Sequence, residues 1–177
     1  INGNGTITGI SAGGLPAGSV TSATLAAGAA TTGSVIQIVE TSTSTQQTPT
    51  GGNYLVVLQQ NITPSATANN IFVSSVIQYG VSTNNNADEG LGFKLTRTVS
   101  GTETTIYESS IAYDVYAYGS QGITEMRAHK PIQFLDTGIS TTSAATYKVY
   151  ARDYSSGSAY VCQAGAKSTL HLTEIKA

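Results

Sequence analysis

The stretch from Gly90 to Val99, GLGFKLTRTV, alternates between apolar and polar side chains. A period of two places successive side chains on opposite faces of an extended chain, so this stretch predicts a β-strand with one face in a core. Arg97 breaks the pattern, because it falls on the apolar face. A buried guanidinium without a partner is costly. We therefore expect Arg97 to meet a carboxylate, with Asp136 and Glu174 as the first candidates.

Similar runs occur on both sides of this stretch, separated by turn residues at intervals of roughly ten residues, a spacing typical of antiparallel sandwiches and jelly rolls. The predicted strands are 35–40, 53–60, 71–79, 90–99, 104–107, 111–118, 131–135, 145–152, 160–162 and 168–175. No segment has a helical period, and residues 119–130 are predicted to be irregular. The sequence thus predicts an all-β chain with an antiparallel β-sandwich or jelly-roll head.

One predicted strand, Tyr54–Leu58, is apolar on both faces. Such a pattern is typical of a strand that is covered on both sides. In a small all-β domain a neighbouring subunit would supply the second cover.

The first 33 residues repeat with a period of five, in which small residues form one ladder and aliphatic residues follow two positions later. The aliphatic positions include Ile10, Leu15, Val20, Leu25 and Val35. So narrow an apolar ridge cannot offset the backbone entropy of ordering it within one chain. We therefore predict that residues 1–33 are an extended glycine- and alanine-rich stem on which copies of the chain assemble, and that residues 34–177 are the head. A flexible linker and a pentapeptide β-helix are the alternatives.

Composition excludes several classes of function. Charged residues make up 10% of the 177 residues and the formal net charge is −2, so no basic stripe is available for nucleic acid. Cys162 is the single cysteine, which excludes an intrachain disulfide and indicates a small buried side chain. No signal sequence or membrane anchor is recognisable in the chain as given.

Signals for catalysis are weak. Residues 9–13 match the nucleophile-elbow pattern, but a glycine-rich stem offers neither the strand nor the helix that this motif requires. Residues 84–89 alternate oxygen ligands without the glycine and terminal acid of a calcium loop, so a solvated loop is favoured. Two histidines are too few for a metal cluster in one chain. We therefore predict a protein that is not an enzyme and has no metal or cofactor.

Aromatic and amide side chains in loops are the remaining candidates for function. Tyrosine rings stack on the apolar faces of sugars, and Asn, Asp and Gln bind sugar hydroxyls. The predicted receptor-binding residues are Asn84, Asn85, Asn86, Asp88, Tyr116, Tyr118, Gln121 and Tyr154, with Tyr113 close by in sequence. The alternative is that these tyrosines only bridge the core and the surface of the sandwich.

Four segments of the predicted head, 90–97, 134–138, 146–152 and 168–175, and residues 19–29 of the predicted stem form a recognisable order along the chain. The four segments resemble the head domains of bacteriophage tail fibres and related virion appendages, and residues 19–29 are similar to the repeats that precede such heads. The resemblance implies a homotrimer on the virion surface, made in the host cytoplasm and attached to other tail or capsid proteins. It also implies recognition of a host polysaccharide or outer-membrane receptor, and it carries over no particular binding residue. A purely structural fibre, knob or decoration protein is the alternative.

Overall fold

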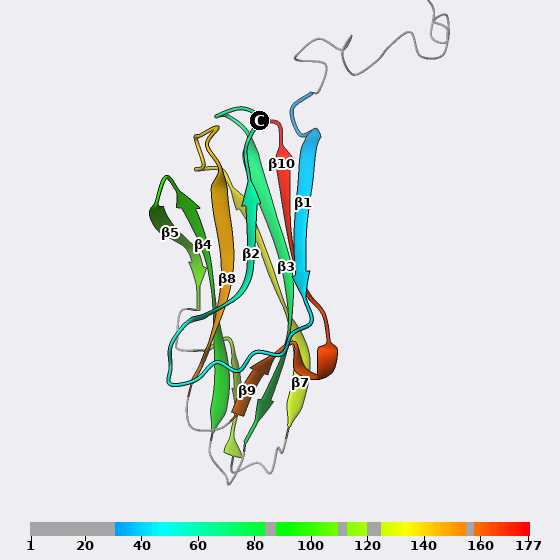
Figure 1. Cartoon of the computed structure of the whole chain (residues 1–177), viewed down its shortest axis with the longest axis vertical. Coiled ribbons are helices and arrows are strands. Elements are labelled where there is room, and N and C mark those ends of the chain that lie inside the picture. The colour runs from blue at the N-terminus through cyan, green and yellow to red at the C-terminus, as the bar shows by residue number, and fades with distance from the viewer. Residues whose placement is uncertain (1–30, 84–87, 110–112, 120–124, 155–157) are drawn as a thin grey trace, which may run out of the picture. The chain divides into compact units, whose positions relative to one another are not determined.

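The computed structural model describes residues 31–83, 88–109, 113–119, 125–154 and 158–177. Contacts within the chain separate residues 1–32 from residues 33–177, and the fold is that of the second unit. Its strands form two antiparallel sheets that face each other (Figure 1). The stem prediction falls almost entirely outside the described residues, including Ile10, Leu15, Val20 and Leu25. Val35, the remaining predicted stem residue, begins the first strand of the head and is 57% exposed.

The first sheet has the strand order β1-β10-β3-β7, and a short strand, β9, also pairs with β3. The bounds of these strands are Val35–Thr43 (β1), Ser168–Ile175 (β10), Asn70–Ser82 (β3), Met126–Asp136 (β7) and Ser158–Val161 (β9). The second sheet has the order β2-β8-β4-β5, and β6 also pairs with β4. Its strands are Leu55–Ile62 (β2), Ala145–Asp153 (β8), Glu89–Val99 (β4), Thr102–Glu108 (β5) and Val115–Ala117 (β6). A 3-10 turn, η3 (Gln163–Gly165), precedes β10.

This strand order is that of a jelly roll, in which two Greek keys wind eight main strands into two packed sheets. Strands that are consecutive in sequence, such as β1 and β2 or β3 and β4, lie in opposite sheets, so most of the pairing is between distant segments. The predicted fold class, an all-β antiparallel sandwich or jelly roll, is confirmed.

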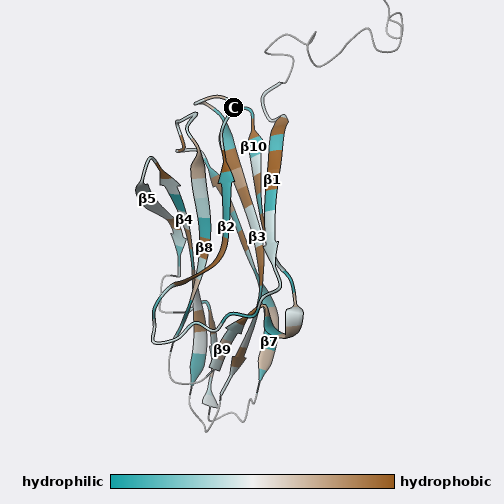
Figure 2. Ribbon diagram, in the orientation of Figure 1, coloured by the Kyte–Doolittle hydropathy of each residue, from teal (hydrophilic) through white to brown (hydrophobic). Residues whose placement is uncertain are grey.

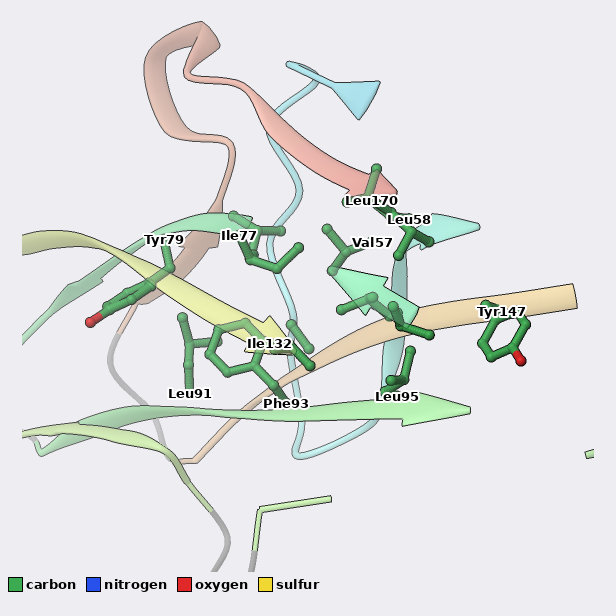
Figure 3. Packing of buried hydrophobic residues seen from close by; sticks show 14 of the residues in the cluster. Val57, Leu58, Ile77, Tyr79, Leu91, Phe93, Leu95, Ile132, Tyr147 and Leu170 are labelled. Carbon is green, nitrogen blue, oxygen red and sulfur yellow. The ribbon is translucent and has the colours of Figure 1, made fainter. Parts of the chain in front are cut away.

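The core lies between the sheets and is built from the alternation that the sequence displays. Apolar and polar segments follow each other along the strands (Figure 2). Ile77 and Tyr79 of β3 belong to the same packed cluster as Phe93 and Leu95 of β4 (Figure 3), and the ring centroids of Tyr79 and Phe93 lie 6.1 Å apart. Side chains of both sheets that are wholly buried include Ile71, Val73, Leu91, Tyr147, Leu170 and Leu172. Burial of such side chains stabilises a fold by about 1.5–3 kcal/mol each.

Arg97 meets the acid that the sequence suggested first. Its Nη1 donates to both carboxylate oxygens of Asp136 at 2.6 Å, across the gap between the sheets. The Tyr147 hydroxyl donates to the same carboxylate at 2.8 Å, and so does the Gly138 amide at 3.1 Å. Burial, followed by the hydrogen bond to Asp136, raises the pKa of Tyr147. The predicted pairing of Arg97 is therefore confirmed, and Asp136 is the centre of a satisfied polar network inside the core.

The prediction that residues 119–130 are irregular is wrong for their second half. Residues 126–130 form the first part of β7 and pair with residues 77–81 of β3. The run of charged side chains hid the alternation: Arg127 and His129 are exposed, whereas Met126, Ala128 and Lys130 are half-buried. Lys130 is accommodated because its ammonium group binds the carboxylate of Asp114 at 2.9 Å. An inward-pointing lysine cannot be distinguished from a surface lysine by sequence pattern alone.

The strand that is apolar on both faces contains an irregularity. The register of β2 against β8 shifts between Val56 and Leu58, so that Val57 and Leu58 are both buried although they are consecutive. A bulge of this kind places two successive side chains on the same side of a sheet. Leu55 and Val56 are more than one-third exposed.

Candidate functional site

Four tyrosine rings gather where β6 and the end of β8 flank the beginning of β4. Tyr116 is the hub, with its ring centroid 4.5 Å from that of Tyr113, 4.7 Å from Tyr118 and 5.2 Å from Tyr154. Tyr113 and Tyr154 are themselves in edge contact at 4.9 Å. Edge-to-face and tilted contacts at these distances are favourable for aromatic rings. We call these four residues the tyrosine cluster.

The cluster has an inner and an outer part. Tyr113 and Tyr116 are half-buried, whereas Tyr118 is 58% exposed and Tyr154 is 43% exposed. The inner rings therefore hold the outer ones in place through edge contacts. The result is an aromatic surface that is exposed to solvent and packs against the half-buried rings of Tyr113 and Tyr116.

Asp88 fixes the hub of the cluster. Its Oδ2 accepts a hydrogen bond of 2.5 Å from the Tyr116 hydroxyl, and its Oδ1 accepts one of 2.9 Å from the backbone amide of Gly119. These two hydrogen bonds lower the pKa of Asp88 below its usual value, and the contact with Asp88 raises the pKa of Tyr116. The site thus combines a carboxylate that is ionised at neutral pH with exposed aromatic faces.

Gly90 makes room for the rings. It pairs with Tyr116 in the ladder between β4 and β6, and its carbonyl accepts a hydrogen bond from the Tyr154 amide. A Cβ atom at this position would lie 2.6 Å from the backbone oxygen of Val115 and 3.2–3.3 Å from atoms of Tyr113 and Tyr116. Only glycine therefore permits this close approach of β6 and the tyrosine side chains to β4.

Gly90→Ala is expected to disrupt the cluster, because the new methyl group collides with the backbone of β6 rather than with a flexible side chain. Overpacking of this kind costs about 1–3 kcal/mol. We expect lower stability in urea together with an altered near-ultraviolet circular dichroism signal from the tyrosines. Gly138→Ala is the matched control, since a Cβ there meets its nearest atoms at the ordinary distance of 3.8 Å. Equal effects of the two substitutions would contradict this account.

A second polar network supports the segment that carries the cluster. The Asp114 carboxylate accepts hydrogen bonds from the Tyr107 hydroxyl at 2.5 Å, from the Ser109 hydroxyl, and from the Lys130 ammonium group at 2.9 Å. Burial alone would raise the pKa of Asp114, but these hydrogen bonds outweigh it and leave the pKa below its usual value. The Asp114 amide also donates to the Leu91 carbonyl at 2.7 Å. Because Lys130 belongs to β7, this network joins the start of β6 to the opposite sheet.

The structure brings four of the predicted binding residues together: Asp88, Tyr116, Tyr118 and Tyr154. They come from three segments of the chain that are distant in sequence. The carboxylate that contacts the Tyr116 hydroxyl is that of Asp88, which is distant in sequence, and not that of Asp114, two residues before Tyr116. The other predicted residues, Asn84, Asn85, Asn86 and Gln121, lie outside the described residues.

Sequence reasoning missed a second aromatic group on the outer face of the β2-β8-β4-β5 sheet. The ammonium group of Lys94 lies 4.3 Å from the ring centroid of Tyr54 and 4.8 Å from that of Tyr150. The guanidinium of Arg152 lies 4.8 Å from the Tyr54 centroid. We call these four residues the cationic cluster. In the sequence, Lys94 and Arg152 fit the alternation as ordinary solvent-facing residues, so no signal distinguished them.

Acidic side chains hold the hydroxyls of the cationic cluster. The Tyr54 hydroxyl donates to Glu108 at 2.8 Å, and the Tyr150 hydroxyl donates to Glu103 at 2.9 Å. Burial, followed by the hydrogen bond to Glu108, raises the pKa of Tyr54 to about 12. Tyr54 is therefore neutral at physiological pH, and the two hydrogen bonds fix the orientation of both rings.

No three His, Cys, Asp or Glu side chains in the described part of the chain are grouped closely enough to hold a metal ion. Nor does the described chain contain a helix of the length and apolarity needed to cross a membrane.

Comparison with known proteins finds no matching family model and no matching curated protein. Solved structures of infectious bursal disease virus are similar to the chain. A structure of the Gx strain aligns with 80% of this chain and 33% of the viral one, at 11% identity and a TM-score of 0.46. The VP2 subviral particle aligns with 81% of this chain and 39% of the viral one, at 14% identity and a TM-score of 0.39. The chain thus spans less than half the length of the viral chains. Its own strand order, rather than this likeness, defines it as a jelly-roll domain with an aromatic surface site.

Proposed function

We propose that this chain is the head of a virion appendage similar to a bacteriophage tail fibre, and that the tyrosine cluster binds a glycan on the host surface. The observation that carries the proposal is the convergence of Tyr116, Tyr118, Tyr154 and Asp88 at one site. Sugar recognition needs aromatic faces for the apolar side of the ring and fixed acceptors for its hydroxyls. The tyrosine cluster offers the aromatic faces and Asp88 offers the acceptor. Contacts within the protein hold both in place before any ligand binds.

The placement on a virion rests on the resemblance of four head segments and of the preceding repeat to tail-fibre sequences. Jelly rolls serve as capsid and lectin domains alike, and a fold by itself does not define a function. The proposal that the chain binds a receptor therefore rests on the tyrosine cluster and Asp88, and not on the fold. Binding without cleavage is expected, and trimer formation through the stem and head is part of the same proposal.

The test is binding of the purified chain to an array of bacterial capsular and lipopolysaccharide glycans. Tyr118→Ala and Tyr154→Ala are each expected to weaken binding at least tenfold, because loss of a central aromatic anchor costs about 1.4 kcal/mol or more. Tyr118→Phe should retain binding, since the ring remains. Tyr160→Ala, on β9 and away from the cluster, is the control.

Unchanged glycan affinity in both alanine variants would contradict the proposal. Release of reducing sugars from the bound polysaccharide would instead indicate a depolymerase.

A purely structural role in the particle is the second candidate, and a specific feature favours it. On the outer face of the first sheet, Ile38, Thr173, Phe72 and Leu135 form one row across four strands. Ile38 is 60% exposed and Leu135 is 46% exposed. Exposed apolar side chains such as Ile38 and Leu135 are typical of contact surfaces between proteins. Tight retention on particles without glycan binding would favour this role.

A further inference from the structure

Lys94 is a cation without an acidic partner in the described part of the chain. Its ammonium group lies over the rings of Tyr54 and Tyr150, and no carboxylate approaches it within ion-pair distance. The aromatic rings attract the positive charge of Lys94 through cation–π contacts. They do not replace an anion as hydrogen-bond acceptor for the three N–H groups of the ammonium. The charge of Lys94 is therefore held in place and still able to bind an anion.

The acids nearest to Lys94 are engaged elsewhere. Glu108 lies opposite Lys94 in the ladder between β4 and β5, but its carboxylate accepts a hydrogen bond from the Tyr54 hydroxyl. The Glu103 carboxylate accepts a hydrogen bond from the Tyr150 hydroxyl and lies 3.7 Å from the ammonium group of Lys148. The carboxylates thus orient the two rings, and the rings in turn orient Lys94. Preorganisation of this kind lowers the entropic cost of binding.

The cationic cluster and the tyrosine cluster lie on the same face of the sheet. Lys94 pairs with Tyr150, Arg152 pairs with Gly92, and Tyr116 pairs with Gly90. Residues 90, 92 and 94 of a strand share one face, and four residues span about 13 Å. A ligand longer than one sugar ring could therefore contact both clusters by following the direction of β4.

Tyr54 also borders a hollow that suits a polar ring. The hollow has a volume of about 220 Å³ and is lined by Thr48, Pro49, Thr50, Asn53, Tyr54 and Leu55. Its loop is fixed by Asp153, which accepts hydrogen bonds from the amides of Gly51 and Gly52 at 3.1 and 2.7 Å. Hydroxyl and amide side chains beside an aromatic ring are the groups that bind sugar hydroxyls.

We propose that Lys94, Tyr54 and Tyr150 form a second subsite that binds a sugar carrying an anionic group, in a polysaccharide whose other sugars contact the tyrosine cluster. The inference rests on the proposed glycan-binding function and adds to it a substrate class, acidic polysaccharides. The ammonium group of Lys94 supplies the charge that a carboxylate or sulfate ester on the sugar would bind.

The test is a nuclear magnetic resonance titration of the whole chain with an oligosaccharide of uronic acids and with a neutral glucan oligosaccharide of the same length. The uronic acid oligomer is expected to shift the backbone amide signals of Lys94 and Tyr150 saturably, and the neutral oligomer is not. Lys94→Met should weaken this response about tenfold. Lys148→Met is the matched control, because it removes a charge from the same sheet face that is already paired with Glu103.

Absence of saturable shifts at Lys94 would overturn the inference, and so would equal losses in Lys94→Met and Lys148→Met, which would indicate a general charge effect. The signals of Tyr118 and Tyr154 report on the tyrosine cluster in the same experiment. If they respond to either oligomer while Lys94 does not, the proposed function stands and only the second subsite fails. If no signal of either cluster responds and the glycan array is also negative, both fail.

Discussion

Asp136→Asn is expected to destabilise the domain by about 3–5 kcal/mol, because it leaves the charge of Arg97 in the core without its counter-ion. The side chains of Arg97 and Asp136 are 15% and 6% exposed, so water cannot replace the lost partner fully. The network also loses the acceptor that best satisfies Tyr147. Urea denaturation followed by far-ultraviolet circular dichroism would measure the change in the free energy of unfolding.

Two further variants separate the charge from the hydrogen bonds. Tyr147→Phe removes one donor and should cost only about 1 kcal/mol. Adding Arg97→Met to Asp136→Asn should recover part of the loss, since no charge then remains buried. A double variant less stable than Asp136→Asn would show that burial of the unpaired guanidinium is not the main cost.

Glu174→Gln is expected to lower stability by about 2–4 kcal/mol at neutral pH. The Glu174 carboxylate is fully buried and accepts hydrogen bonds from Gln37 at 2.6 Å, Ser65 at 2.7 and 2.8 Å, and Asn69 at 2.6 Å. A glutamine replaces one acceptor oxygen by a donor, so at least one of these donors faces another donor. Unsatisfied buried groups cost about 1–3 kcal/mol each.

The same residue should make the domain sensitive to acid. Burial alone would raise the pKa of Glu174, but its hydrogen bonds lower the pKa below that of an unfolded glutamate. The unfolded state therefore binds a proton first as the pH falls. The contribution of Glu174 is complete above the unfolded pKa, near 4.5, and is lost as the pH falls through the lower folded value.

Urea denaturation between neutral pH and pH 3 would check this dependence. The difference in unfolding free energy between the wild type and Glu174→Gln should shrink as the pH falls. Glu40→Gln, at an exposed position on β1, is the control and should change stability by less than about 0.5 kcal/mol. A difference that stays constant over this range would contradict the role given to the Glu174 carboxylate.

The fold class follows from the sequence because period-two alternation is directly visible in it. The same alternation placed Arg97 on the apolar face and so predicted an acidic partner, for which Asp136 and Glu174 were the first candidates. Lys130 obeys the same geometry in β7, yet it was assigned to an irregular segment. A single charged residue among apolar ones is conspicuous, whereas a charged residue among other charged ones is not.

The candidate site was predictable only in part. The occurrence of tyrosines in or near predicted loops suggested Tyr116, Tyr118 and Tyr154, and the polar loop before β4 suggested Asp88. Their meeting depends on strand pairing, because Gly90 of β4 lies between β6 and the end of β8. Pairing partners far apart in sequence leave no local signal. The cationic cluster went unnoticed for the same reason, since Lys94 acquires its aromatic neighbours from β8 and from the segment before β2.

Gly90 and the outer tyrosines face different constraints in evolution. Every substitution of Gly90 introduces a Cβ for which there is no space. We therefore expect this position to tolerate no other residue. Tyr118 and Tyr154 project into solvent and are held mainly by other rings, so their replacement alters the surface without collapsing it. The exposed aromatic side chains could therefore be exchanged one at a time, while Gly90 preserves the strand packing that supports them.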